Sequence, residues 1–312
     1  MANNKSAKSR TASSLFNFMN GIITQLHNNE QYGTWLHYRT TLNSFKRFRQ
    51  NQDLPLRKMN SEMIESYEAY LKRQGLCRNT TSFYMRILRA VYNRAAEQGL
   101  VAQQHPFRRV YTGIDKTRKR AISFAAIKRI KQLDLHHSPS LDMARDAFIL
   151  SFYLCGISFI DLAHLKKTDI RNGYLHYNRR KTHQHIIVKW EPQMQALADK
   201  YKHLTADTPF LFPFLHYKAD EEKSDIRLYR NASARITYHL KKIKQQIGMQ
   251  GNLTLYVARH SWATAARDHH YPVSVISEAL GHDSETTTQI YLRSIQTSEV
   301  DKANAEMLSE LS

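Results

Sequence analysis

The sequence predicts a mainly α-helical protein of two domains that carries one small β-hairpin. Its 312 residues exceed the length of a typical single domain. Apolar residues recur at three- and four-residue spacing along most of the chain, as they do on amphipathic helices. Only residues 174–190 combine two short β-rich runs with a polar basic turn between them, which is typical of a hairpin.

The first domain is expected to be entirely helical. Residues 1–12 are polar and basic, and we expect them to form a flexible arm. Within residues 13–109 the helical spacing appears four times, in residues 14–29, 34–51, 60–75 and 80–99. The last two segments end in Gly75 and Gly99, as helices often do.

The charge of the chain indicates a polyanionic partner. Lys and Arg number 46 against 27 Asp and Glu, which gives a net charge of +19 and a pI near 9.9. Residues 1–120 hold 21 of the basic and only 7 of the acidic groups. Such an imbalance favours nucleic acid as the partner, with a solubilising surface as the alternative.

Basic residues lie on the helix faces away from the apolar stripes, where they either contact phosphate or form a solvated surface. Residues 110–120 are dense in cations and lack periodicity, so we expect a basic linker that follows a phosphate backbone. The candidates for DNA contact are Lys46, Arg47, Arg49, Arg86, Arg89, Arg118, Lys119, Arg120, Arg179 and Arg180.

The second domain is expected to span residues 121–312. Helical spacing resumes in residues 123–133 and 141–156, before the hairpin of residues 174–177 and 185–190. A charged loop and a helix over residues 233–248 follow. Residues 297–312 have the pattern of an amphipathic packing helix, which lies either on its own domain or on a neighbouring subunit.

Several classes of protein are disfavoured. Cys77 and Cys155 are the only cysteines, which gives neither a disulfide framework nor a zinc finger. The N-terminus has no apolar signal segment, and the longest apolar run, residues 147–157, is too short to span a bilayer. We therefore expect a soluble cytoplasmic protein that uses no metal or cofactor and has no membrane partner.

Four residues form an ordered set in the second domain. Lys181 lies on the hairpin turn, Arg259 in "ARHSWAT", His282 in "LGH", and Tyr291 nine residues later. Each is weak evidence alone, because the chain holds 16 histidines and 17 tyrosines. In this order they resemble the catalytic domain of the tyrosine recombinase (phage integrase) family, from about residue 121 to 292. The preceding helices are similar to that family's core-binding domain, so the resemblance implies a helical core-binding domain followed by an α+β catalytic domain.

The four residues also suit the cleavage of a phosphodiester. A phenol has a pKa near 10, which makes Tyr291 a good nucleophile for a reversible covalent step that needs neither ATP nor metal. Arg259 is expected to fork onto the scissile phosphate, and His282 to donate to a non-bridging oxygen. Lys181 is the candidate general acid for the departing 5′ oxygen.

Two positions depart from the family pattern. Tyr256 stands where the family usually has histidine or lysine, three residues before Arg259. Ser158 stands where the family has its first catalytic arginine, two residues after the glycine of "CGISFIDL". Loss of one such donor costs about 3–4 kcal/mol of transition-state stabilisation, so we expect another cation to replace it. The candidates are Arg145, Arg179, Arg180 and Arg293.

The resemblance implies a site-specific recombinase that acts on double-stranded DNA with specific recombination sites through a 3′-phosphotyrosine. It also implies a homo-tetramer on DNA and a Holliday junction, and allows an accessory DNA-bending protein. The reaction is inversion of a DNA segment, integration and excision of a mobile element, or resolution of dimers, and the sequence leaves these alternatives open. The alternatives are a non-catalytic, sequence-specific DNA-binding accessory protein on the same scaffold and a type IB topoisomerase-like enzyme.

Overall fold

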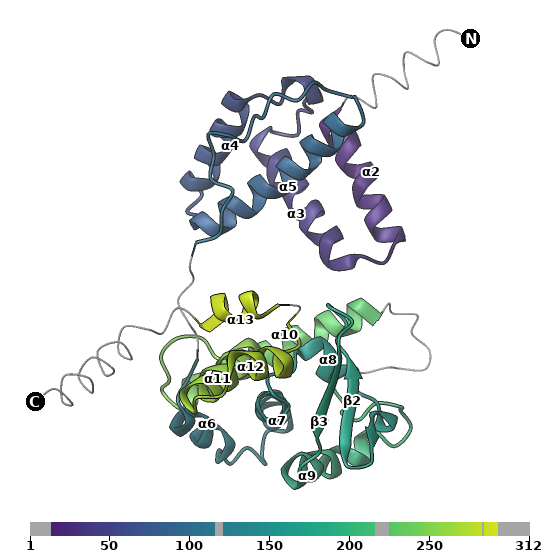
Figure 1. Cartoon of the computed structure of the whole chain (residues 1–312), viewed down its shortest axis with the longest axis vertical. Helices are drawn as coiled ribbons and strands as arrows, with labels where there is room; N and C mark the ends of the chain where they lie inside the picture. Colours follow the sequence, from purple (N-terminus) through teal and green to yellow (C-terminus); the bar gives the residue numbers. More distant parts are fainter. Residues whose placement is uncertain (1–13, 116–120, 216–224, 283, 293–312) are drawn as a thin grey trace, which may run out of the picture. The chain divides into compact units, whose positions relative to one another are not determined.

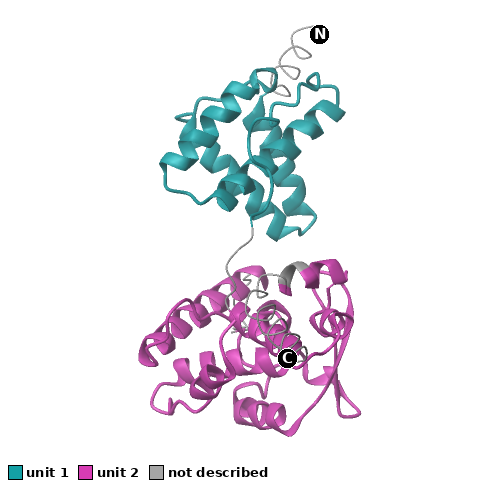
Figure 2. Ribbon diagram, turned by 60° about the vertical axis from the view of Figure 1, so that its left-hand side comes forward, with its two compact units in different colours: residues 1–117 teal, residues 118–312 magenta. Residues whose placement is uncertain are grey.

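The computed structural model describes residues 14–115, 121–215, 225–282 and 284–292, with the backbone only at residues 290 and 291. The chain divides into two compact units, residues 1–117 and 118–312 (Figure 2). The described residues are mostly helical with one small sheet, which confirms the predicted fold class. The expected N-terminal arm and the helix over 297–312 lie outside them.

Unit 1 contains the four predicted helices (Figure 1). They are α2 (Leu15–Asn28), α3 (Tyr32–Phe48), α4 (Ser61–Arg73) and α5 (Arg78–Glu97), with the 3-10 turn η1 (Leu56–Lys58) before α4. Ser14 and Asn60 cap α2 and α4 by accepting a main-chain N–H with their side chains. Met19, Phe45 and Tyr67 are among the large side chains that form the core.

The segment after α5 packs on unit 1 as far as Asp115. The Asn79 side chain binds the main-chain N–H of Asp115 at 2.7 Å and its carbonyl at 3.0 Å. The Ser82 hydroxyl donates to the carbonyl of Gly113, and Arg89 donates to the Thr112 hydroxyl at 2.8 Å. The first six residues of the expected linker are therefore held on α5.

Unit 2 is built around a buried central helix, α7 (Pro139–Tyr153), which contacts α10 and α11 (Figure 1). The other helices are α6 (Phe124–Lys131), α8 (Phe159–Ala163), α9 (Pro192–Tyr201), α10 (Asp225–Gln246), α11 (Leu255–Asp268), α12 (Val273–Leu280) and α13 (Glu285–Leu292), with 3-10 turns η2 (Lys167–Asp169) and η3 (Lys202–Leu204). Helix α10 begins at Asp225, eight residues before the start that its apolar spacing predicted.

The predicted hairpin is confirmed and gains a third, short strand. Strands β1 (Ile170–Arg171), β2 (Tyr174–Asn178) and β3 (His185–Lys189) form an antiparallel sheet in the order β1-β2-β3. Tyr174 pairs with Lys189, and Asn178 pairs with His185. Alternate residues of β2 and β3 are buried, so this face fixes the hairpin on the core and holds the turn of residues 179–184 in place.

None of the described helices is both long and apolar enough to cross a membrane. Within the same described residues, no three His, Cys, Asp or Glu side chains gather as a metal site would require.

Candidate active site

Arg259 joins three segments that are distant in the sequence. It lies on α11 and is only 6% exposed. Its Nη1 donates to the carbonyl of Gly156 at 2.8 Å, and its Nη2 donates to the carbonyl of Leu280 at 2.5 Å. The same Nη2 lies 3.1 Å from His282 Nε2. Two of the predicted site residues, Arg259 and His282, are therefore in direct contact.

Two glycines make this approach possible. Gly156 has a φ of +77°, and a Cβ there would lie 2.8 Å from both Cα and Cγ of Arg259. Gly281 ends α12 with a φ of +61°, and a Cβ there would lie 2.9 Å from Ile186 Cδ1 and overlap Arg179 Cδ. Both positions require glycine for its left-handed backbone and for the missing side chain.

His282 is held on its other side by Thr288 of α13. Its Nδ1 lies 2.7 Å from the Thr288 hydroxyl, which is fully buried. A guanidinium group has only donors, so Nε2 accepts from Arg259 in the neutral imidazole and Nδ1–H donates to Thr288. Thr288 thus connects the histidine to the helix that contains Tyr291.

Tyr291 lies in the last turn of α13, and its side chain is outside the described residues. The helix itself is fixed by Leu292, which is buried with Ala263 of α11 and with Ile276 and Leu280 of α12. The main chain of the candidate nucleophile is therefore held beside the helices that carry Arg259 and end before His282.

Arg179 is a second buried arginine, and it contacts the turn at Gly281 that precedes His282. It is 8% exposed, and its Nη1 donates to the carbonyl of Gly281. Its Nε lies 3.9 Å from Asp161 Oδ2. Arg179 and Arg259 thus donate to the consecutive carbonyls of Gly281 and Leu280, immediately before His282.

Ser158 lies beside this cluster at the start of α8, which it precedes as N-cap. Its hydroxyl donates to Asp161 Oδ2 at 2.6 Å, and Asp161 Oδ1 accepts the main-chain N–H of Arg180 at 2.9 Å. The buried Asp161 carboxylate therefore links position 158 to the hairpin turn.

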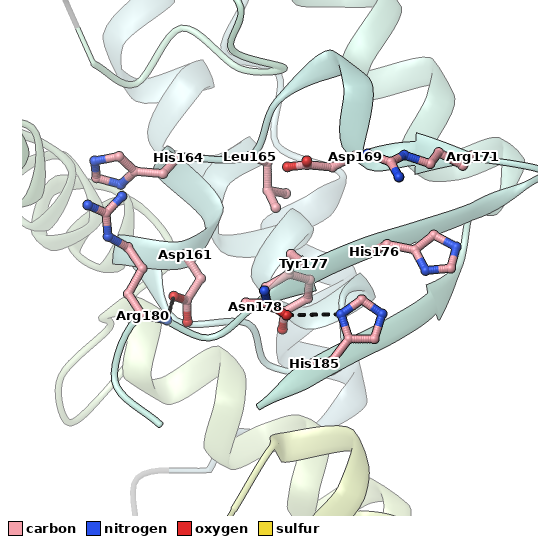
Figure 3. Close-up of a pocket in the computed structure, with 10 residues that line it drawn as sticks. All are labelled: Asp161, His164, Leu165, Asp169, Arg171, His176, Tyr177, Asn178, Arg180 and His185. Atoms are coloured by element: carbon pink, nitrogen blue, oxygen red, sulfur yellow. Dashed lines mark hydrogen bonds between the residues drawn. The ribbon is translucent and has the colours of Figure 1, made fainter. Parts of the chain in front are cut away.

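Arg180 points away from the Arg259–His282 contact. Its Nη2 lies 3.1 Å from Asp225 Oδ2, and Asp225 also binds His164 Nε2 at 2.9 Å. Figure 3 shows the Arg180 side chain extending toward His164. Both residues line a polar pocket between α8 and the hairpin, which has a volume of about 310 Å³. Lys181 is exposed at the tip of the turn and makes no hydrogen bond or ion pair within the described parts of the chain.

Arg145 belongs to a different cluster. Its Nε donates to Asp146 at 2.7 Å, and it also binds Asp142. Lys200 lies 2.6 Å from the same Asp146, and the Tyr201 hydroxyl lies 2.7 Å from it. Burial alone lowers the pKa of Arg145, but Asp146 and Asp142 raise it above its ordinary value. Arg145 is thus neutralised by carboxylates, while the candidate Arg293 lies outside the described residues.

Tyr256 lies on α11, one turn before Arg259, and is 54% exposed. Its ring packs edge-on against His260, with the ring centres 4.4 Å apart. Tyr256 therefore occupies the rim near Arg259, and its described ring contact is with His260.

Buried groups adjoin Arg179, Arg259 and Asp161, which together with His282 are called the site cluster below. Burial raises the pKa of the Cys155 thiol, which precedes Gly156, to about 11. Burial also raises the pKa of the Tyr177 phenol on β2, and the negative charge of Asp161 adds to this effect. Desolvation of this kind strengthens the interaction between a guanidinium group and a phosphate.

The candidate DNA-binding residues of unit 1 differ in their contacts. Arg47 is exposed, and the Lys46 ammonium lies 5.3 Å from the centre of the Phe16 ring. Arg49 and Arg86 each have a buried Nε that lacks a hydrogen-bond partner among the described residues. Arg89 binds Thr112, while Arg118, Lys119 and Arg120 lie outside the described residues.

Sequence reasoning assigns no role to Asp161 or Thr288. Asp161 only stands in register with the family pattern. Thr288 lies six residues after His282 on another element, and nothing in the sequence marks it as a partner of the imidazole.

Comparison with known proteins yields two matches to family profiles. Residues 14–110 match the phage integrase SAM-like domain, and residues 124–297 match the phage integrase family. Among named relatives, tyrosine recombinase XerD of Shewanella oneidensis is 22% identical over 260 residues, covering 81% of this chain and 83% of that protein. Tyrosine recombinase XerA of Pyrococcus furiosus is 25% identical over 268 residues, covering 75% and 90%.

Solved structures share the fold. A lambda integrase dimer bound to a COC′ core site has a TM-score of 0.68 at 17% identity, covering 94% of this chain and 82% of that one. The lambda integrase tetramer bound to a Holliday junction also has a TM-score of 0.68 at 17% identity, covering 92% and 82%. The Tn1549 transposon integrase in complex with transposon right end DNA has a TM-score of 0.64 at 13% identity, covering 95% and 99%.

Proposed function

The chain belongs to the phage integrase family of tyrosine recombinases, an enzyme family, and from this premise we propose that it cleaves and rejoins double-stranded DNA at specific sites through a covalent 3′-phosphotyrosine. The observation that supports this most is the contact between Arg259 and His282, with α13 held beside both by Thr288 and Leu292. Arg259 and His282 supply donors where the charge of a pentacoordinate phosphate develops.

The proposed cleavage step is balanced by the residues of the site. The Tyr291 oxygen forms a bond to phosphorus while its phenolic proton passes to solvent, and the bond from phosphorus to the 5′ oxygen breaks. Lys181, exposed on the turn, gives a proton to that 5′ oxygen. When the phosphate takes the place of the Arg259–His282 contact, His282 gains a proton on Nε2 and donates it to one non-bridging oxygen, while Arg259 donates to another. Thr288 keeps Nδ1 in place throughout.

We further propose that unit 1 and the basic segment before residue 121 grip the DNA backbone. The charge of residues 1–120 and the exposed side chain of Arg47 support a surface that binds phosphate. Relatives solved on a core site and on a Holliday junction support DNA as the partner and a homo-tetramer as the assembly. The biological outcome proposed is inversion of a segment or integration and excision of a mobile element.

Covalent trapping tests the proposal and selects the target site in the same experiment. The full chain is incubated with a pool of randomised duplexes that each carry a nick, so that the short strand released by cleavage diffuses away and the adduct accumulates. Sequencing of the adducted DNA should yield one preferred site. An adduct that forms equally well with Tyr291→Phe contradicts the assignment of the nucleophile.

A second function is favoured by one observation, the neutral residue at position 158. A DNA-binding accessory protein that has lost catalysis would select the same kind of site in a binding assay yet form no adduct with it. Binding selection on the same pool, run in parallel, separates the two functions.

A further inference from the structure

We propose that Arg179 is a catalytic residue that places a second guanidinium group on the scissile phosphate, in the role that Ser158 cannot fill. This inference rests on the proposed function and adds to it the identity of the missing cation. A serine hydroxyl offers one neutral hydrogen bond, whereas a guanidinium group offers a charged fork.

The first support is position. Arg179 and Arg259 come from different elements, the hairpin turn and α11, yet their guanidinium groups donate to the adjacent carbonyls of Gly281 and Leu280. His282 follows directly and contacts Arg259. We infer that a phosphate bound by Arg259 and His282 lies within reach of the guanidinium group that is anchored one residue away.

The second support is the charge that Arg179 retains. Its nearest carboxylate, Asp161, is 3.9 Å from Nε and is shared with the Ser158 hydroxyl and the main-chain N–H of Arg180. Nη1 is bound to Gly281, and Nη2 makes no hydrogen bond within the described residues. A buried guanidinium group with a free edge and a shared counter-ion is suited to an additional anion.

The third support is the link between Arg179 and position 158. Ser158 Oγ and Arg179 Nε both approach the same atom, Asp161 Oδ2. An arginine at position 158 would compete with Arg179 for this carboxylate and place two cations in one niche. Serine at position 158 leaves the space beside Asp161 to Arg179. The absence of an arginine at position 158 and the presence of a catalytic arginine at position 179 therefore depend on each other.

The other candidates fit less well. Arg145 is bound by Asp142 and Asp146 in a separate cluster. Arg180 is adjacent in sequence but extends toward His164 and binds Asp225 (Figure 3). Arg180 is therefore a matched control, since it is an arginine of the same turn that differs in what it contacts.

The test compares Arg179→Ala, Arg179→Lys and Arg180→Ala on the nicked duplex recovered by the adduct selection. The rate of adduct formation should fall about 10²–10³-fold with Arg179→Ala and at least about tenfold with Arg179→Lys. The rates are measured with protein in saturating excess over DNA, so that any loss of a DNA contact by Arg180 does not limit them, and Arg180→Ala should then stay within about tenfold of the wild type. Because Arg179→Ala removes the ion pair of the buried Asp161, thermal melting and DNA binding of each variant are measured first. Arg179→Lys preserves the charge if the alanine variant does not fold.

A neutral substrate separates direct phosphate contact from a structural role. The same duplex is made with a methylphosphonate at the scissile position, which removes the negative charge that the guanidinium group would stabilise. The deficit of the Arg179 variants should then shrink to within about tenfold of the wild type, with at least one of the two diastereomers. An undiminished deficit with both diastereomers, or normal cleavage of the phosphate by Arg179→Ala, overturns the inference. Absence of an adduct with the wild type itself contradicts the proposed function and the inference with it, so the two failures are distinct.

Discussion

Unit 2 holds a half-buried arginine, Arg145, in one cluster and two buried arginines, Arg179 and Arg259, in another, and the two clusters are built differently. In the first, Arg145 is enclosed by Asp142 and Asp146, and Lys200 and Tyr201 complete the network. In the second, Arg179 and Arg259 donate to the main-chain carbonyls of Gly281 and Leu280, and Arg259 also donates to that of Gly156. The shared carboxylate of Asp161 lies nearby.

Under the proposed function, this difference separates a charge that stabilises the fold from a charge that binds phosphate. An arginine that lies among carboxylates has its charge compensated within the fold. Arg145 also donates to the carbonyl of Leu133, and the shared Asp146 joins α7 to α9 through Lys200 and Tyr201. Carbonyl acceptors orient a guanidinium group while they leave most of its charge available to an anion. Burial alone therefore does not identify a catalytic arginine, because the chemical type of its partners decides.

The largest effect on stability is expected from the carboxylate cluster. Arg145→Ala leaves Asp142 and Asp146 facing Lys200 alone, so the free energy of unfolding should fall by about 3–5 kcal/mol. Urea unfolding of the full chain measures this, with exposed Arg171→Ala as a control that should change it by less than about 0.5 kcal/mol. Adduct formation per folded molecule should remain near wild type. A stable Arg145→Ala protein with a large cleavage defect would reverse the roles assigned to the two clusters.

Substitution in the site cluster should slow DNA cleavage more than it lowers stability, which is the reverse of the effect expected at Arg145. Arg259→Ala should slow adduct formation by about 10²–10³-fold, which corresponds to about 3–4 kcal/mol in the activation barrier. Salt-dependent DNA binding should persist, because most phosphate contacts lie elsewhere on a duplex-binding protein. Arg267→Ala, on the same helix and paired with Asp268, is the control. Equal cleavage by the two variants would be inconsistent with a phosphate role for Arg259.

A third experiment tests whether the Cys155 thiol, which precedes Gly156 beside the site cluster, is shielded from water. Burial raises the pKa of Cys155 from 9.0 to about 11, so the reactive thiolate at pH 8 is about a hundredfold scarcer than in an ordinary thiol. Cys77 is exposed in unit 1, and its hydrogen bond with Thr80 lowers the pKa of its thiol. Iodoacetamide at pH 8 should therefore label Cys77 first, and labelling of Cys155 should accelerate as the pH rises toward 11. Mass spectrometry of each cysteine peptide gives the two rates, and equal rates at pH 8 would show that water reaches Cys155.

The smallest effect concerns the positioning of His282. Thr288→Val removes the acceptor of Nδ1–H and should slow adduct formation by about fivefold, since one hydrogen bond contributes roughly 1 kcal/mol. Thr288→Ser keeps the hydroxyl and should restore most of the rate. The pH dependence of cleavage should shift only in the valine variant, because only that variant changes the environment of the imidazole. A serine variant as slow as the valine variant would assign Thr288 to packing.

The sequence predicted the elements whose signals are local. The four helices of unit 1, the hairpin of residues 174–190 and helices α6 and α7 follow from apolar spacing and turn chemistry, and the structure contains them. Short elements such as α8 and β1 were not predicted, because five or two residues carry too little periodicity.

The site was predictable in part. Lys181, Arg259, His282 and Tyr291 occur in the order and spacing of the family motif, which can be recognised in the sequence alone. The structure brings Arg259 and His282 into contact. Choosing among the four candidate cations required tertiary contacts. Arg179 and Arg180 are adjacent and chemically identical, and only the strand register and the turn send one toward Gly281 and the other toward Asp225.

The assignment of Tyr291 as the nucleophile is tested most directly by the location of the covalent bond. The adduct recovered from the nicked duplex is digested with protease and nuclease, and the modified peptide is sequenced by mass spectrometry. Cleavage through a 3′-phosphotyrosine predicts a single peptide in which Tyr291 carries a nucleotide through its 3′ phosphate. The released strand should have a free 5′ hydroxyl. A nucleotide on any other residue, or a linkage through a 5′ phosphate, would contradict it.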